Sequence, residues 1–264
     1  MNIKHLKRIG RKGALARMRL YGNPGTTAGR RLGGLHSILI HRSKNTGFII
    51  LRKISFPHNS SILAELCGIL AGDGHIGEYQ ITVTTNTDTD IEHAQYVKLL
   101  FEKLFNVPVS ILKRRNKNAC VVVVSSKEVS RFFISKGLVK GHKIHGGLKM
   151  PLWISSTQRY KLAFMKGLFD TDGCVYIDMH KINGRKYKNI GMAFTNRSLP
   201  LLNDFKKALE SIGLHPTQKT KYTVFLRRKE DIRGYFDVVG SSNQKHVRKI
   251  ATFFSQSRRC ARNW

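Results

Sequence analysis

Two stretches of the chain repeat one pattern: Ile62-Leu-Ala-Glu-Leu-Cys-Gly-Ile-Leu-Ala-Gly-Asp-Gly74 and Lys161-Leu-Ala-Phe-Met-Lys-Gly-Leu-Phe-Asp-Thr-Asp-Gly173. Each is largely apolar, has a small residue at every fourth place and ends in Asp-Gly. This spacing predicts two helices that pack closely on each other through their small residues. These residues are Gly68, Gly72, Gly167 and Thr171. The final glycines, Gly74 and Gly173, are expected in the left-handed conformation that ends a helix.

The likeness continues beyond the motifs, and Asp73 and Asp172 lie 99 positions apart. After each motif, the hydrophobic pattern predicts a hairpin, a helix, a second strand pair and a third helix. The expected strands cover 78–85, 109–115 and 119–125 in the first copy, and 175–195, 217–222 and 223–228 in the second. The expected helices cover 93–105 and 199–212, and the third helices begin at Lys127 and Lys229. The chain is therefore expected to contain two pseudo-symmetric αββαββα units of the α+β class, packed through their motif helices, each with an antiparallel sheet.

The repeat also sets the expected domain boundaries. A basic arm covers 1–58, the first repeat 59–157 and the second repeat 158–264. The link between the repeats is expected near 146–157, a segment that contains Pro151.

The charge balance points to a polyanionic partner. Lys and Arg number 47 against 16 Asp and Glu, which gives a net charge of +31. Nucleic acid is the usual partner of so basic a chain. No apolar run approaches the ~18 residues of a membrane-spanning helix, so no membrane association is expected. Four unpaired cysteines and the lack of a signal peptide predict the cytoplasm, with nucleoid association, or an organellar matrix rather than secretion.

The first 58 residues are exceptionally basic. Thirteen Lys and Arg residues, from Lys4 to Lys53, precede the first acidic residue, Glu65. The stretches Gly22-Asn-Pro-Gly-Thr26 and Gly33-Gly34 are expected to break any long helix. A nucleic-acid-binding arm is favoured over an organellar transit peptide, which needs an uninterrupted amphipathic helix.

The repeated Asp-Gly ending suggests a shared metal site. Asp73 and Asp172 would project from the ends of two crossing helices, where two carboxylates repel each other unless a divalent cation lies between them. Hard oxygen ligands favour Mg²⁺ or another divalent cation such as Mn²⁺, and such a metal activates water and stabilises a leaving oxygen. The alternative is that each Asp-Gly is only a helix stop.

At this point the sequence resembles the LAGLIDADG homing endonucleases in their single-chain, two-motif form. The resemblance rests on Leu66-Cys-Gly-Ile-Leu-Ala-Gly-Asp-Gly74 and Met165-Lys-Gly-Leu-Phe-Asp-Thr-Asp-Gly173, and it extends from about residue 60 to the C-terminus. It implies a site-specific endonuclease that hydrolyses both strands of a long, asymmetric double-stranded DNA target with Mg²⁺. Because one chain holds both motifs, a monomer is expected to suffice.

The resemblance also implies roles for individual residues. Asp73 and Asp172 match the metal-binding catalytic acids, whereas Asp170 matches the motif's first Asp, which is not the essential ligand. Late in each repeat the family has a basic residue near the metal, and Lys143 and Lys245 match these positions. A lysine there would order water or offset charge in the transition state, although each is equally well read as a phosphate contact or a solvated side chain.

Two asparagines complete the implied catalytic set. Asn86 and Asn196 resemble the family's polar residue that positions water. Alternatively, each asparagine only terminates a strand.

The alternating strands predict the DNA-binding surface, because a two-stranded ribbon fits the major groove. In the first repeat, Gln80, Thr82 and Thr84 alternate with the apolar Ile81 and Val83. The remaining candidate contacts are basic residues near hairpin turns. They are Lys113, Arg114, Arg115 and Lys117 in the first repeat, and His180, Lys181, Arg185, Lys186, Lys188, Lys219, Lys221, Arg227 and Arg228 in the second.

Two other functions fit the same scaffold: an intron RNA maturase, with intron RNA as a partner, and a non-catalytic DNA-binding regulator. Retention of both acids favours the nuclease, because a pure binder gains nothing from carboxylates that face phosphates. The ending Arg262-Asn-Trp264 lacks the His-Asn end of a protein-splicing element. A free-standing or intron-encoded protein is therefore expected rather than an intein.

Overall fold

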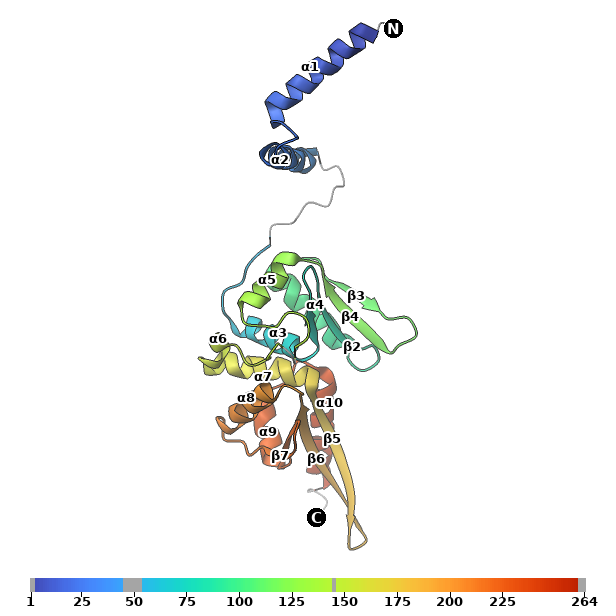
Figure 1. The fold of residues 1–264 in the computed structure, drawn as a ribbon. Helices are drawn as coiled ribbons and strands as arrows, with labels where there is room; N and C mark the ends of the chain where they lie inside the picture. The colour runs from blue at the N-terminus through green and yellow to red at the C-terminus, as the bar shows by residue number, and fades with distance from the viewer. Residues whose placement is uncertain (1–2, 45–53, 144–145, 261–264) are drawn as a thin grey trace. The chain divides into compact units, whose positions relative to one another are not determined.

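The computed structural model describes residues 3–44, 54–143 and 146–260. The chain divides into two compact units, Met1–Lys53 and Ile54–Trp264, which are described separately (Figure 1). Arg52 and Lys53 of the expected basic arm and the ending Arg262-Asn-Trp264 lie outside the described residues.

The first unit contains two helices, α1 (Ile3–Tyr21) and α2 (Thr27–Lys44). The turn between them forms around Asn23, whose side-chain oxygen accepts the Gly25 N–H at 2.9 Å and whose carbonyl accepts the Thr26 N–H at 3.0 Å. The break expected at Gly22 is thus present. The break expected at Gly33-Gly34 was wrong, because α2 continues through both residues. Each helical glycine costs about 1 kcal/mol relative to alanine, which weakens a helix without ending it.

The first repeat follows the expected order. Its elements are α3 (Ser61–Gly72), β1 (Gly74–Ile76), β2 (Ile81–Asn86), α4 (Ile91–Phe105), β3 (Ser110–Lys113), β4 (Ala119–Val124) and α5 (Lys127–Ser135). The hairpin begins directly after the motif, so the expected strand 78–85 corresponds to β2 alone. A short helix, α6 (Leu152–Ser155), lies in the link between the repeats.

The second repeat has the same order with one added helix. Its elements are α7 (Gln158–Asp172), β5 (Gly173–Ile182), β6 (Arg185–Thr195), α8 (Leu199–Glu210), β7 (Thr217–Thr220), β8 (Thr223–Leu226), α9 (Lys229–Val238) and α10 (Gln244–Cys260). The sequence pattern did not predict α10. It packs beside β5, where the Lys249 ammonium donates to the Val175 carbonyl at 3.1 Å.

Each repeat has one four-stranded sheet, and both sheets have equivalent strand orders: β1-β2-β4-β3 and β5-β6-β8-β7. All neighbouring strands are antiparallel. The hairpin of β5 and β6 pairs from Gly173 to Ile182 and projects beyond the rest of its sheet (Figure 1). Its counterpart, β1 with β2, pairs over three residues of β1. The hairpin of the second sheet therefore extends farther than the equivalent hairpin of the first sheet.

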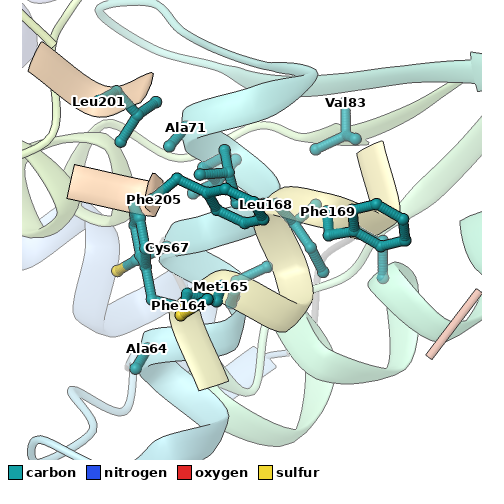
Figure 2. Close-up of a cluster of buried hydrophobic side chains, with 14 of the residues drawn as sticks. Ala64, Cys67, Ala71, Val83, Phe164, Met165, Leu168, Phe169, Leu201 and Phe205 are labelled. Atoms are coloured by element: carbon teal, nitrogen blue, oxygen red, sulfur yellow. The ribbon is translucent and has the colours of Figure 1, made fainter. Parts of the chain in front are cut away.

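The motif helices α3 and α7 form the centre of the second unit. A Cβ atom added to Gly68 would lie 2.1 Å from the Phe164 carbonyl oxygen, and one added to Gly167 would lie 2.1 Å from that of Glu65. The helices thus meet backbone to backbone, as the small residues predicted. Apolar side chains of both helices, with Phe205 of α8 and others, surround this contact (Figure 2).

Among the described residues, no helix combines the length and apolar character needed to cross a membrane.

Candidate functional site

Asp73 and Asp172 lie at the C-terminal ends of the two motif helices. Asp73 caps α3, where its N–H donates to the Ile69 carbonyl at 3.1 Å, and Asp172 is the last residue of α7. A helix C-terminus has a partial negative charge and disfavours a nearby carboxylate. Both acids therefore lie where a carboxylate is electrostatically unfavourable.

The glycines that follow the acids do not have the left-handed conformation expected of them. Gly173 has φ −91° and ψ 156°, and Gly74 begins β1 without a positive φ. A Cβ atom on Gly74 would lie 2.5 Å from the Leu70 Cα, and one on Gly173 would lie 2.3 Å from the Phe169 carbonyl oxygen. Glycine is required here because the strand leaves the helix at very close range.

The surroundings of both carboxyl groups oppose their ionisation. Burial, followed by the negative charge of Asp73, raises the pKa of Asp172 to about 7. Asp73 reaches solvent, yet the protein packed around its carboxyl group raises its pKa above the ordinary value, with Asp90 as an additional cause. A cation at this centre would relieve the same unfavourable electrostatics.

The donor set fits a hard divalent cation that is only partly coordinated by protein. Among the described residues, no group of three or more His, Cys, Asp or Glu side chains is placed to hold a metal ion. Mg²⁺ commonly binds through one or two carboxylates and completes its coordination with waters and phosphate oxygens. Asp73 and Asp172 are the carboxylates that could hold such an ion.

Lys143 lies beside both acids. Its ammonium group donates to the Ala71 carbonyl at 3.1 Å and to the Gly72 carbonyl, which are the last carbonyls of α3. This contact offsets the negative end of the helix. Burial lowers the pKa of Lys143, and the charges of Asp172 and Asp73 oppose that shift. The structure thus brings together three of the residues implied by the resemblance.

The two asparagines differ. The Asn196 side chain donates to an Asp172 carboxylate oxygen at 2.6 Å, and its own oxygen accepts the Ser198 N–H at 2.8 Å. The Asn86 side chain instead accepts the N–H groups of Asp88 and Thr89, at 2.8 and 3.1 Å, in the turn after β2. Asn196 therefore orients an acid, whereas Asn86 shapes a turn.

Lys245 is also not equivalent to Lys143. Its ammonium forms an ion pair with the buried Asp90 at 2.8 Å, and the same carboxylate oxygen accepts the Asn243 side-chain N–H at 2.7 Å. Thr89 donates to the other oxygen of Asp90 at 2.8 Å. Lys245 is thus near the centre but is paired with a carboxylate outside the motif.

Asp170 lies in a buried polar cluster between the repeats. Its carboxylate accepts the Ser241 hydroxyl and, at 2.8 Å, the Ser242 N–H, and its carbonyl accepts the Asn243 side chain at 3.1 Å. Burial raises the pKa of Asp170 to about 7. These contacts fix the loop that leads into α10.

The same cluster continues to Glu65 of α3. Lys166 of α7 forms an ion pair with Glu65 at 2.8 Å, and Tyr96 and Ser242 each donate to Glu65 at 2.7 Å. Glu65 is 4% exposed, so its carboxylate is buried, whereas the Lys166 side chain remains partly exposed.

In the first repeat, the predicted DNA contacts separate from the core. Thr82 and Thr84 alternate along β2 with the buried Ile81 and Val83, and Gln80 precedes the strand on the surface. Lys113 ends β3, and the exposed residues that follow it form the β3–β4 turn. These are Arg114, Arg115 and Lys117.

In the second repeat, the basic residues do not share one face. Val175 and its partner Met192 are buried, so the strand alternation places Lys181, Lys186 and Lys188 on the helix side of the β5–β6 hairpin. His180 and Arg185 lie on the opposite, open face. The other four predicted contacts lie in or beside β7 and β8 and are exposed. They are Lys219, Lys221, Arg227 and Arg228.

Sequence reasoning missed the residues that connect the repeats, chiefly Asp90, Asn243 and Glu65. Asn243 lies two residues before Lys245, a predicted site residue, so its position near the site could have been inferred. Nothing in the sequence relates Asn243 to Asp90, 153 positions away. An acid inside a hydrophobic motif helix, as Glu65 is, was the one visible indication of a buried ion pair.

Comparison with known proteins supports the resemblance. Residues 159–251 match the family model described as a LAGLIDADG-like domain, which covers most of the second repeat. Together with the two sheets and the paired motif helices, this match confirms the resemblance to LAGLIDADG proteins. The second repeat thus matches a LAGLIDADG-like domain, and the first repeat has the same order of helices and strands.

Two curated proteins align with much of the chain. The replication factor C small subunit of Methanocaldococcus jannaschii is 25% identical over 217 residues, which is 74% of this chain. The tRNA-splicing ligase RtcB of Methanopyrus kandleri is 24% identical over 205 residues, which is 69% of this chain. The alignments span only 11% and 20% of those proteins.

Several solved structures are similar at low identity. I-DmoI in complex with DNA and Mn is 18% identical with a TM-score of 0.46, over 69% of this chain and 97% of that one. The I-SmaMI LAGLIDADG homing endonuclease bound to cleaved DNA is 13% identical with a TM-score of 0.49, over 77% and 92%. Full-length WhiA from Thermotoga maritima is 15% identical with a TM-score of 0.46, over 76% and 62%.

Proposed function

We propose that the protein is a site-specific endonuclease that hydrolyses phosphodiester bonds in both strands of a long, asymmetric double-stranded DNA target with a divalent metal ion. The observation that supports this most strongly is the shared centre at the ends of α3 and α7. There Asp73 and Asp172 meet in an environment that opposes their charge, and Lys143 lies beside both acids.

The metal would be held by Asp73 and Asp172, with Mg²⁺ or Mn²⁺ as the expected ion. When bound, such an ion activates water and stabilises the leaving oxygen of a phosphodiester. Asn196 holds Asp172 in place through its 2.6 Å hydrogen bond. Lys143 supplies a positive charge beside both acids, where it would offset the charge that develops on the scissile phosphate.

The two sheets would bind the DNA on either side of this centre. Their open faces present Thr82 and Thr84 in the first repeat and His180 and Arg185 in the second. Because the β5–β6 hairpin reaches farther than β1–β2, the two halves would contact unequal lengths of DNA. One chain holds both acids, so one chain per duplex is expected.

The test is cleavage of DNA that carries the uninterrupted insertion site of the gene, or of a randomised library where that site is unknown. We expect defined double-strand breaks with Mg²⁺ or Mn²⁺ and none with EDTA. Binding without cleavage in either metal would contradict the nuclease and support the non-catalytic regulator. Preferential binding of intron RNA would support the maturase.

A further inference from the structure

The two halves of the proposed catalytic centre are built from equivalent residues that make different contacts. Lys143 and Lys245 occupy equivalent places late in their repeats, as Asn196 and Asn86 do after their strands. Within the described residues, Asn196 bonds to Asp172, whereas no hydrogen bond joins Asn86 to Asp73. An asparagine side chain therefore orients Asp172, whereas the equivalent asparagine is engaged in a turn.

The lysines differ in the same sense. Lys143 donates to carbonyl oxygens, and no carboxylate of the described residues lies within hydrogen-bond distance of its ammonium. Lys245 shares one buried carboxylate oxygen of Asp90 with Asn243, at 2.8 and 2.7 Å. Its backbone N–H also donates to the Asn243 side-chain oxygen at 3.1 Å. Asp90 thus neutralises Lys245, and Asn243 fixes its backbone.

The late segment of each repeat contacts the N-cap of a helix in the other repeat. This arrangement brings Lys245 to Asp90. Leu148, which follows Lys143, accepts a hydrogen bond from Ser198, the N-cap of α8 in the other repeat. In the same way, the segment of Lys245 reaches Asp90, the N-cap of α4 in the first repeat. The second repeat therefore has a neutral serine where the first has a buried carboxylate.

We propose that Asp90 is a positioning residue that restrains Lys245 and makes the two halves of the centre unequal, so that the strand cut in the Asp172 half is hydrolysed first. This inference rests on the proposed function. Lys143 lies beside both acids, and Lys245 is a second lysine near Asp73. Asp90 would delay the second cut because it neutralises Lys245, which would otherwise add to the offset of phosphate charge in the Asp73 half.

The test substitutes Asp90→Ser, which places at α4 the cap that the second repeat uses at α8, and serine is a favourable N-cap. The matched control is Glu92→Gln. It removes the exposed ion pair of Glu92 with Arg248, at 2.7 Å, between the same helices α4 and α10 but without a contact to Lys245. Both variants weaken the docking of α10, and only the first releases the lysine.

Single-turnover cleavage of a supercoiled plasmid with a confirmed target follows the nicked and linear products. We expect the wild-type protein to accumulate nicked plasmid, and Asp90→Ser to accelerate the second cut several-fold. Glu92→Gln should leave both steps unchanged. Direct conversion to linear plasmid by the wild type, or a slower second cut in Asp90→Ser, would overturn the inference while leaving the nuclease function intact.

A second readout needs neither DNA nor metal. The rate at which an amine-acylating reagent modifies Lys245, followed by mass spectrometry, should rise several-fold in Asp90→Ser and stay at the wild-type value in Glu92→Gln. Equal rates in all three proteins would overturn the inference even if the chain cleaves no DNA.

Discussion

Asp73 and Asp172 lie at two adjacent helix C-termini, where the fold disfavours negative charge. The sequence predicted these acids because the Asp-Gly ending recurs in a repeated unit. It also predicted Lys143 and Asn196, which the structure brings to the same centre. The contacts of Lys245 and Asn86 were not predictable, because they depend on Asp90 and on a local turn rather than on the repeat.

Two buried histidines predict a pH dependence of stability. None of the four ring nitrogens of His93 and His246 has a hydrogen-bond partner among the described residues. Burial lowers the pKa of His246 to about 3 and that of His93 to about 4. The unfolded chain therefore binds these protons more readily than the folded chain. The stability contributed by the neutral rings is present above pH ~6.5 and is lost as the pH falls toward 3.

We expect His246→Gln to remove one of these contributions to the pH dependence. Between pH ~6.5 and 5, the wild type should lose about 2 kcal/mol of unfolding free energy relative to the variant. Urea unfolding at several pH values measures this difference. His58→Gln, at an exposed position, is the control, and parallel curves for wild type and His246→Gln would refute the prediction.

At the scale of elements, the motif helices were the best-predicted part of the chain, because small residues at every fourth position indicate close packing of two helices. The conformation of Gly74 and Gly173 was predicted wrongly, since Asp-Gly at a helix end commonly signals a left-handed stop. Here the chain turns directly into a strand that passes close to Leu70 and Phe169. The helix α10 was missed because it has no counterpart in the first repeat.

The contact between α3 and α7 predicts a large effect of a single methyl group. In Gly68→Ala, the new Cβ would lie 2.1 Å from the Phe164 carbonyl oxygen and 2.8 Å from the Leu168 nitrogen, so α7 must shift. We expect a loss of about 1–3 kcal/mol of unfolding free energy, the usual cost of overpacking. Chemical denaturation measures it.

Gly34→Ala in α2 is the matched control, because its Cβ would meet nothing within 4 Å. This substitution should favour the helix by about 1 kcal/mol, as alanine does in place of helical glycine. If Gly68→Ala were as well tolerated as Gly34→Ala, the close packing of the motif helices would be wrong.

At the scale of the whole molecule, charge and duplication were readable from the sequence, whereas the connections between the repeats were not. The net charge of +31 and the 99-residue offset of the motifs needed no structure. The ion pair of Lys166 with the buried Glu65, and the contacts of each late segment with the other repeat, join residues far apart in the chain. Such pairings depend on how the two repeats pack on each other, and the sequence pattern of one repeat does not reveal that packing.

The basic arm predicts a salt-dependent contribution to DNA binding. The first unit, 1–53, contains thirteen Lys and Arg residues and no acid. Each phosphate that the arm neutralises should add about 0.9 to the slope of log affinity against log salt for duplex DNA. Deleting 1–53 should therefore weaken binding and flatten this slope while cleavage persists at low salt. An unchanged slope in a titration by fluorescence anisotropy would exclude a role of the arm in duplex binding.

The most direct test of the metal-dependent centre replaces each acid separately. Asp73→Asn and Asp172→Asn keep the size of the side chain and remove the charge that would hold the metal. We predict that each variant binds the target with near wild-type affinity, because binding rests on phosphate and groove contacts. Double-strand cleavage with Mg²⁺ should fall by at least two orders of magnitude, the effect of losing ~3 kcal/mol of transition-state stabilisation. Wild-type cleavage rates in either variant, measured under single-turnover conditions on a confirmed target, would contradict the assignment of the centre to these two residues.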